Sequence, residues 1–259
     1  MIRGACEGKL RGMSELGQRC VRAVALLGLA TGCTGGTETG NPPFVAALAY
    51  TGTSSAPEDY ALDSRGAVAT VRSAWLDLEA VTLTPEGSCD GTGQPLVSPA
   101  LGVGDHAAGA HVETSFEASA GRFCTATLPF VRARTVPSSA PEELEGRSVL
   151  LLGELSDGTP FSIASELEPR FELAAISSGI QLSPGDASLL VAFDFAAWLR
   201  PVRFAVATRE DGQIHIDAGS NPELLARFEA ALGEGVALYR DPNADGVLDD
   251  DSELLARPR

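Results

Sequence analysis

The stretch SVLLLGELSDGTPFSIAS, Ser148–Ser165, decides the fold class of this chain. Val149–Leu155 is rich in apolar residues, and Phe161–Ala164 resumes a strand-like pattern after the segment Ser156-Asp157-Gly158-Thr159. An Asp-Gly pair readily supplies the positive φ that a tight hairpin turn needs. The stretch therefore predicts two antiparallel strands joined by a short turn.

Further strand and turn signals follow on both sides of this hairpin. Pro184-Gly185-Asp186 precedes a long apolar strand over Ser188–Phe195, and Glu210-Asp211-Gly212 separates expected strands at Arg203–Thr208 and Ile214–Ile216. Between residues 75 and 83 the apolar positions cannot all lie on one face, which indicates a bulge or a two-sided strand. Many short strands with turns at this spacing predict an antiparallel β-sandwich. The other expected strands are 44–50, 67–72, 75–83 and 123–128.

One helix is expected near the C-terminus. Ser220-Asn221-Pro222-Glu223 offers a capping residue, an early proline and a first-turn acid, and Gly233 and Gly235 mark the end. The apolar residues between them recur on one helical face, which predicts an amphipathic helix packed on the sandwich. The fold class is therefore mainly β: an antiparallel β-sandwich over 44–217, with a C-terminal amphipathic helix and an acidic loop over 218–259.

The N-terminal residues have the pattern of an export signal. Arg19 and Arg22 precede the short apolar run 23–30, which is followed by small residues. A positive region, a short apolar region and a small-residue cleavage point are typical of a secretory signal. The run is too short to span a bilayer, which takes about 20 apolar residues. Residues 1–32 are therefore predicted to be a signal peptide, and its length favours a true start at Met13.

The segment Ala30-Thr31-Gly32-Cys33 resembles the lipobox of bacterial lipoproteins, although Ala30 stands where that family usually has a larger apolar residue. The resemblance implies that Cys33 is acylated and becomes the mature N-terminus, so that the lipid anchors the chain to a membrane. Thr34 in place of Asp implies the outer membrane of a Gram-negative cell. The alternative is a plain signal peptide with an incidental cysteine. Residues 33–43, poor in apolar side chains, are expected to be a flexible tether.

Charge excludes one class of partner. Residues 1–32 carry a net charge of +3 and the whole chain −16, so the predicted mature part carries −19 by subtraction and contains no lysine. An acidic surface repels phosphate backbones, which argues against nucleic-acid binding. It also leaves membrane attachment to the lipid itself.

The cysteines fit the same location. If Cys6 and Cys20 leave with the signal and Cys33 takes the lipid, Cys89 and Cys124 remain as a pair in an oxidising compartment. We expect them to form a disulfide. Two free thiols or a metal site are the alternatives.

The layout from SVLLLGELSDGTPFSIAS to QLSPGDASLLVAFDFAAWL is similar to uncharacterised bacterial lipoproteins built on a prealbumin-like or carbohydrate-binding-like sandwich, over roughly residues 60–210. The resemblance supports the fold and implies no activity. With the signal, it indicates a cell-envelope binding or structural module whose partner is an envelope protein or a polysaccharide.

The segment from Asp241 to Glu253 resembles an EF-hand or similar DxDxDG calcium loop. Calcium prefers six to eight oxygen ligands, and acids at every second residue can surround it while glycine makes the sharp turn. The expected ligands are Asp241, Asn243, Asp245, Val247, Asp249 and Glu253, with Ser252 at the twelfth position where the family closes the site. A solvated acidic turn is the alternative.

Other polar residues give weaker signals. His106 and His111, near Asp105 and Glu113, lie in a predicted loop, where exposed histidines are favoured over a metal site. An envelope hydrolase that uses carboxylates such as Asp194 and Asp217 is the alternative function, because folding can bring distant carboxylates together. The aromatic side chains are expected to be buried rather than to form a sugar platform; they are Trp75, Trp198, Tyr50, Tyr60 and Tyr239.

Overall fold

The computed structural model describes residues 42–53, 59–61, 68–87, 89, 91, 93–107, 111–176 and 178–259, all within a unit that spans Asn41–Arg259. The predicted signal peptide, the lipidation site at Cys33 and nearly all of the predicted tether lie outside these residues.

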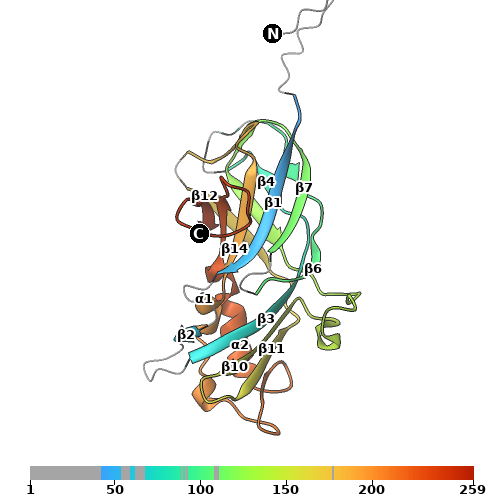
Figure 1. The fold of residues 1–259 in the computed structure, drawn as a ribbon, viewed down its shortest axis with the longest axis vertical. Helices are drawn as coiled ribbons and strands as arrows, with labels where there is room; N and C mark the ends of the chain where they lie inside the picture. The colour runs from blue at the N-terminus through green and yellow to red at the C-terminus, as the bar shows by residue number, and fades with distance from the viewer. Residues whose placement is uncertain are drawn as a thin grey trace, which may run out of the picture. The chain divides into compact units, whose positions relative to one another are not determined.

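Strands dominate the described chain, which confirms the predicted mainly-β class (Figure 1). The strands are β1 Phe44–Thr53, β2 Asp59–Ala61, β3 Val68–Leu78, β4 Thr82–Thr84, β5 Leu96–Val97, β6 Gly102–Asp105, β7 His111–Ala118, β8 Gly121–Phe123, β9 Thr125–Pro129, β10 Val149–Leu155, β11 Pro160–Ser165, β12 Arg170–Ala175, β13 Ile180–Leu182, β14 Ser188–Asp194, β15 Ile214–Ile216, β16 Val236–Arg240 and β17 Glu253–Pro258. The α-helices are α1 Phe195–Leu199 and α2 Pro222–Ala231, and the 3-10 helices are η1 Glu142–Leu144, η2 Phe204–Val206 and η3 Leu232–Gly235.

The larger sheet has nine strands in the order β5-β4-β9-β12-β17-β16-β14-β1-β7. β14, the apolar strand expected after Pro184-Gly185-Asp186, has five consecutive buried residues, as a strand covered on both faces requires. β1 lies between β14 and β7, pairing parallel with the first and antiparallel with the second (Figure 1). This parallel pair and that of β11 with β15 depart from the predicted all-antiparallel arrangement.

The smaller sheet contains the hairpin that the sequence predicted. Its order is β15-β11-β10-β3-β2, with β6 also paired to β3. β10 and β11 pair antiparallel from Val149 opposite Ser165 to Glu154 opposite Pro160, and Gly158 has φ +79° at the turn. The expected irregularity after Trp75 takes the form of a break between β3 and β4. A register shift in the pairing of β3 with β10 lies earlier in β3, opposite Leu152 and Gly153.

One hydrophobic core contains residues of both sheets and of both α-helices. At its centre the fully buried Trp198 donates its indole N–H to the Leu232 carbonyl at 2.8 Å. Its ring lies 5.2 to 6.4 Å, between centroids, from the surrounding aromatic rings of Phe130, Phe193, Phe195 and Phe228. α1, which was not predicted, begins where the Asp194 carboxylate accepts the Ala197 N–H and thereby caps the helix.

The prediction of a second hairpin, between Arg203–Thr208 and Ile214–Ile216, is wrong. The turn at Glu210–Gln213 forms, but the expected strand Arg203–Thr208 is replaced by η2, and β15 pairs parallel with β11. Phe204 is buried against Phe161, with ring centroids 4.9 Å apart, and the Asn221 side chain bonds both the N–H and the C=O of Thr208. The Asn221 side chain thereby occupies the backbone N–H and C=O of Thr208, which a partner strand would otherwise bond.

α2 forms as predicted, but not with a side-chain cap. Asn221 is in the left-handed region at φ +57°, and its carboxamide binds Thr208 and the His215 carbonyl instead. Residues 218–259 do more than pack on the sandwich, because β16 and β17 lie within the nine-stranded sheet, between β12 and β14. No helix in the described part of the chain is long and apolar enough to cross a membrane.

Candidate functional site

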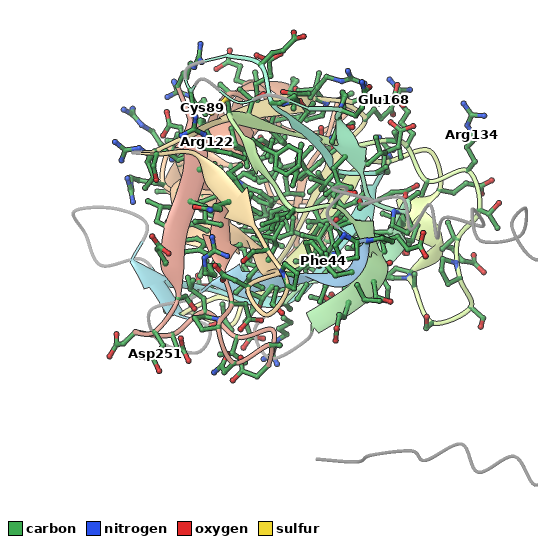
Figure 2. All side chains as sticks on the ribbon, turned by 90° about the horizontal axis from the view of Figure 1, so that it is seen from above. Phe44, Cys89, Arg122, Arg134, Glu168 and Asp251 are labelled. Atoms are coloured by element: carbon green, nitrogen blue, oxygen red, sulfur yellow. A yellow bond between two sulfur atoms is a disulfide. The ribbon has the colours of Figure 1, made fainter. Side chains whose placement is uncertain are left out.

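The acidic loop 241–252 connects β16 to β17, two neighbouring strands inside the larger sheet. Its backbone turns at Ala244, with φ +55°, and at Gly246, with φ +70°. The side chain of Asp251 reaches outward at the edge of the molecule (Figure 2). Both ends of the loop are therefore fixed by a sheet, while much of its middle faces solvent.

Asp241 is the buried member of the loop, with 2% of its surface exposed. One carboxylate oxygen, Oδ2, accepts the Gly246 N–H at 2.9 Å. The other, Oδ1, is buried and has no hydrogen-bond partner. A buried carboxylate oxygen without a donor or cation is unfavourable, so this atom marks a place where a positive ligand would stabilise the loop.

Asn243 lies between two further acids of the loop. Its carboxamide nitrogen donates to Asp245 Oδ2 at 3.0 Å and to Asp249 Oδ2 at 3.4 Å. The amide therefore supplies the partial positive charge that holds the two carboxylates near each other. Rotation of the amide by half a turn would present its carbonyl oxygen there instead, and carbonyl oxygens are calcium ligands.

Glu253 is not brought to the other predicted ligands. It begins β17 opposite Arg240, and its carboxylate forms an ion pair with that guanidinium at 3.4 Å. Ser252 lies in the loop instead, donating to Asp249 Oδ1 at 3.0 Å. Among the described residues, no three His, Cys, Asp or Glu side chains are grouped closely enough to hold a metal ion.

The predicted disulfide is confirmed. Cys89 and Cys124 are bonded, with their Cα atoms 5.2 Å apart. The bond closes a loop of 35 residues, which stabilises the fold by about 3–4 kcal/mol in the chain-entropy model.

The expectation that His106 is exposed is wrong. This residue is fully buried, its ring lying 6.0 Å from Tyr50 and 5.4 Å from Phe193 between centroids, and neither ring nitrogen has a hydrogen-bond partner. Its neighbour Asp105 accepts the N–H groups of Ala74 and Ala107. Burial lowers the pKa of His106 to about 4, so the ring is neutral near pH 7. The side chain of His111 lies outside the described atoms.

The two carboxylates considered for hydrolysis stabilise separate turns. Asp194 caps α1, whereas Asp217 accepts the N–H groups of Gly219 and Ser220, at 2.7 Å each. The aromatic residues do not form an exposed row either: Trp198 and Tyr50 are fully buried, and Trp75 and Tyr239 are half-buried. Tyr60 has no described side chain.

Sequence reasoning missed the role of Arg240. This arginine, directly before the acidic loop, bonds Asp186 as well as Glu253 and therefore holds the closing glutamate on the sheet. Alternation along β16 would place Arg240 on the face of the buried Val236 and Leu238, so its ion pair with Glu253 follows only from the pairing of β16 with β17.

Among known proteins, the chain has a distant structural similarity to one solved structure and no sequence match to a family model or curated protein. The solved structure of MbnP from Methylosinus trichosporium is similar with a TM-score of 0.41 and 10% sequence identity, over 66% of this chain and 83% of that one. At this level the likeness carries no information about ligand or activity.

Proposed function

We propose that this protein is a lipid-anchored, exported module of the cell envelope that binds or supports other envelope components, is not catalytic, and carries a structural calcium site in the acidic loop. The lipid on Cys33 would hold it to the outer membrane, and the tether would separate the sandwich from the bilayer. The bound partner would be an envelope protein or a polysaccharide.

Two features support the location. The signal-like N-terminus and the lipobox-like segment both indicate export. The disulfide between Cys89 and Cys124 fits the same compartment, because disulfides persist where the surroundings are oxidising.

The buried, unpartnered Oδ1 of Asp241 carries the calcium proposal. Asp245, Asp249 and the Asn243 amide lie in the same loop at the spacing of a DxDxDG site, and the Val247 carbonyl would add a further oxygen. Calcium would supply positive charge among these acids, whose mutual repulsion otherwise opposes a compact loop. Because the loop joins two inner strands, the ion would stabilise the sheet rather than act as a sensor.

Thermal unfolding of the chelator-treated protein, with and without calcium, tests this role. Calcium at about a hundred times its Kd should add about 2.7 kcal/mol to the free energy of unfolding, which raises Tm by several degrees. The Asp241→Asn and Asp245→Asn variants should lose this calcium-dependent rise, since each removes a ligand charge.

Asp250→Asn is the matched control, because Asp250 is exposed in the same loop but lies outside the ligand spacing. It should keep the calcium-dependent rise in Tm. The calcium site is contradicted if the Tm of the parent protein does not rise with calcium, or if the Asp250→Asn variant loses the rise like the other two variants.

The observations give the hydrolase no comparable support, because Asp194 and Asp217 are engaged in different turns.

A further inference from the structure

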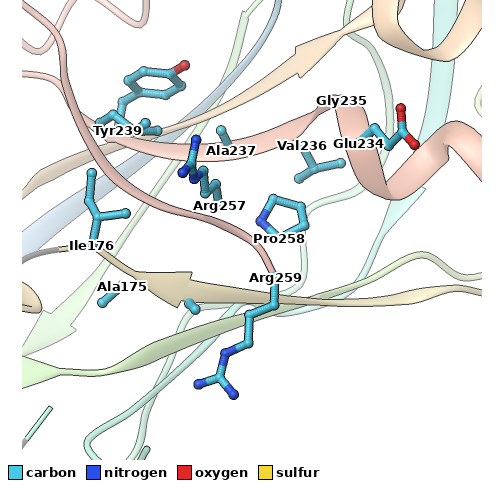
Figure 3. A pocket seen from close by; sticks show the side chains of 12 residues that line it. Ala175, Ile176, Glu234, Gly235, Val236, Ala237, Tyr239, Arg257, Pro258 and Arg259 are labelled. Atoms are coloured by element: carbon cyan, nitrogen blue, oxygen red, sulfur yellow. The ribbon is translucent and has the colours of Figure 1, made fainter. Parts of the chain in front are cut away.

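A groove of about 710 Å³ crosses the end of β12 and the strands β17 and β16 (Figure 3). Its floor is made of small residues. They include Ala174 on β12, which is paired with Arg257 on β17, and Ala237 on β16. The Arg257 side chain lies beside Ala237 and Tyr239, while Arg259 extends away from them. The short neighbours leave the stem and the guanidinium of Arg257 open to a ligand.

A second hollow of about 220 Å³ shares one lining residue with this groove. It lies between α1 and α2 and is lined by Arg200 and Arg227, and Glu234 lines both hollows. We call the surface around both hollows the arginine groove; its charged and aromatic members are Arg200, Arg227, Arg257, Arg259, Glu234 and Tyr239.

The four arginines of the groove are exposed, and none forms an ion pair with any residue whose position is described. Elsewhere in the described chain, Arg72, Arg147 and Arg240 are paired with acids, whereas Arg134, Arg170 and Arg203 are exposed without an ion pair to a described residue. The whole chain carries a net charge of −16. Four unpaired guanidinium groups around one groove therefore form a local positive surface on an acidic protein, which attracts anions.

The remaining polar groups restrict the kind of anion. Arginine binds carboxylates and phosphates alike through two parallel hydrogen bonds. The Glu234 carboxylate would repel a ligand with charge along its whole length, but it accepts hydrogen bonds from hydroxyl groups. Burial, aided by the nearby Asp194 charge, raises the pKa of Tyr239, so its phenol keeps a proton to donate. A ligand with spaced carboxylates and many hydroxyls matches this set.

The backbone beneath the groove disfavours an acidic peptide. β17 and β16 lie inside the nine-stranded sheet, with their N–H and C=O groups bonded to neighbouring strands on both sides. A peptide cannot add there as a further strand, which is the usual source of main-chain affinity on a sheet. Recognition must come from side chains, and the Tyr239 ring and the alanine floor suit the flat apolar faces of sugar rings.

We propose that the arginine groove binds an acidic glycan, a chain of sugars that carry carboxylates. Arg257 would hold one carboxylate-bearing part of the chain, and Arg200 and Arg227 would hold another. Glu234 would bind hydroxyls between these two parts, and Tyr239 would bind hydroxyls on the other side of Arg257. The groove depends neither on the lipid on Cys33 nor on calcium in the loop 241–252.

Titration calorimetry of the full chain in detergent, first treated with a chelator and then exchanged into calcium-free buffer, with short polygalacturonate chains tests the proposal. Polygalacturonate should bind, and methyl-esterified polygalacturonate, which has the same sugars without the charge, should bind at least about tenfold more weakly. Arg257→Ala and Arg227→Ala should each weaken binding by about tenfold, and the double variant should abolish it.

Arg134→Ala is the matched control, since Arg134 is also exposed and unpaired among the described residues but reaches outward from another part of the surface (Figure 2). It should bind like the parent. All three arginines are on the surface, so the variants should keep the parent Tm, and that measurement excludes misfolding. The proposal is overturned if polygalacturonate does not bind, if Arg257→Ala leaves its Kd unchanged, or if polyglutamate binds as tightly, which would indicate an acidic peptide. Because the buffer holds no calcium, none of these results depends on the loop site.

Discussion

His106 is a buried polar ring without a partner. It packs edge-on against Tyr50 and Phe193, and both of its nitrogens lack hydrogen bonds. The ring can be accommodated only while it is neutral, which is why its pKa falls to about 4, against about 6.5 in an unfolded chain. Between these two pH values the unfolded state binds a proton that the folded state does not.

His106→Phe should therefore change how stability depends on pH. As pH falls from 6.5 to 4, protonation of His106 in the unfolded chain lowers the stability of the parent by on the order of 3 kcal/mol, and the variant lacks this loss. At pH 7 the variant should be at least as stable, because phenylalanine fills a similar volume with no unsatisfied nitrogen. Denaturant unfolding of both proteins at pH 7 and pH 4.5 measures the difference. If the difference in the free energy of unfolding between the two proteins does not increase at the lower pH, His106 is not a buried neutral histidine.

At the residue scale the sequence predicted what local chemistry determines. Cys89 and Cys124 could be paired by elimination once the other cysteines were assigned. The positive φ of Gly158 followed from the predicted hairpin turn. The burial of His106 could not be foreseen, because it depends on Phe193, which is distant in sequence and reaches the histidine only through the fold.

At the scale of elements, η3 controls how closely the helices approach the sheet. A Cβ on Gly235 would lie 2.5 Å from the Asp194 carbonyl oxygen and 2.5 Å from Trp198 Nε1. The same region holds the hydrogen bond from Trp198 to the Leu232 carbonyl. Gly235 therefore allows the central tryptophan to pack against the chain that enters β16.

Gly235→Ala should destabilise the protein by about 1–3 kcal/mol, because the added methyl group must displace either backbone or the indole ring. Gly233→Ala is the matched control in the same element, since its Cβ would meet Phe171 at an ordinary 3.7 Å. That variant should be neutral or slightly stabilised. Denaturant unfolding compares the two; equal stabilities would show that the close approach at Gly235 is unimportant.

Elements fixed by local sequence were predicted well. The hairpin of β10 and β11, the strand β14 and the helix α2 follow from turn chemistry and from apolar periodicity. The replacement of the expected strand Arg203–Thr208 by η2 could not be predicted in this way, because it depends on the Asn221 side chain, thirteen residues away from Thr208. Likewise, parallel pairing of β1 with β14 joins segments that no short-range signal connects.

At the scale of the whole molecule, the C-terminal residues are part of the main sheet. β16 and β17 lie between β14 and β12, so the acidic loop connects two inner strands and the arginine groove lies on the same strands. The sequence predicted the acidic loop. It did not predict the groove, because Arg200 follows α1, Arg227 lies on α2, and Arg257 and Arg259 lie in and after β17, so that only folding brings them to the same surface.

The proposed lipid on Cys33 is the central claim, because it would give the acidic sandwich its place in the cell. A chain with this net charge has little attraction for anionic lipid headgroups, so in this proposal the anchor supplies the attachment. Replacing Cys33 by alanine should therefore release the protein from the membrane fraction without changing its fold.

Intact mass spectrometry of the protein purified from the membranes of a Gram-negative host measures the claim most directly. The account predicts a mature chain that begins at Cys33 and carries a diacyl or triacyl group. An unmodified secreted chain, with a free Cys33 or a different N-terminus, would contradict it.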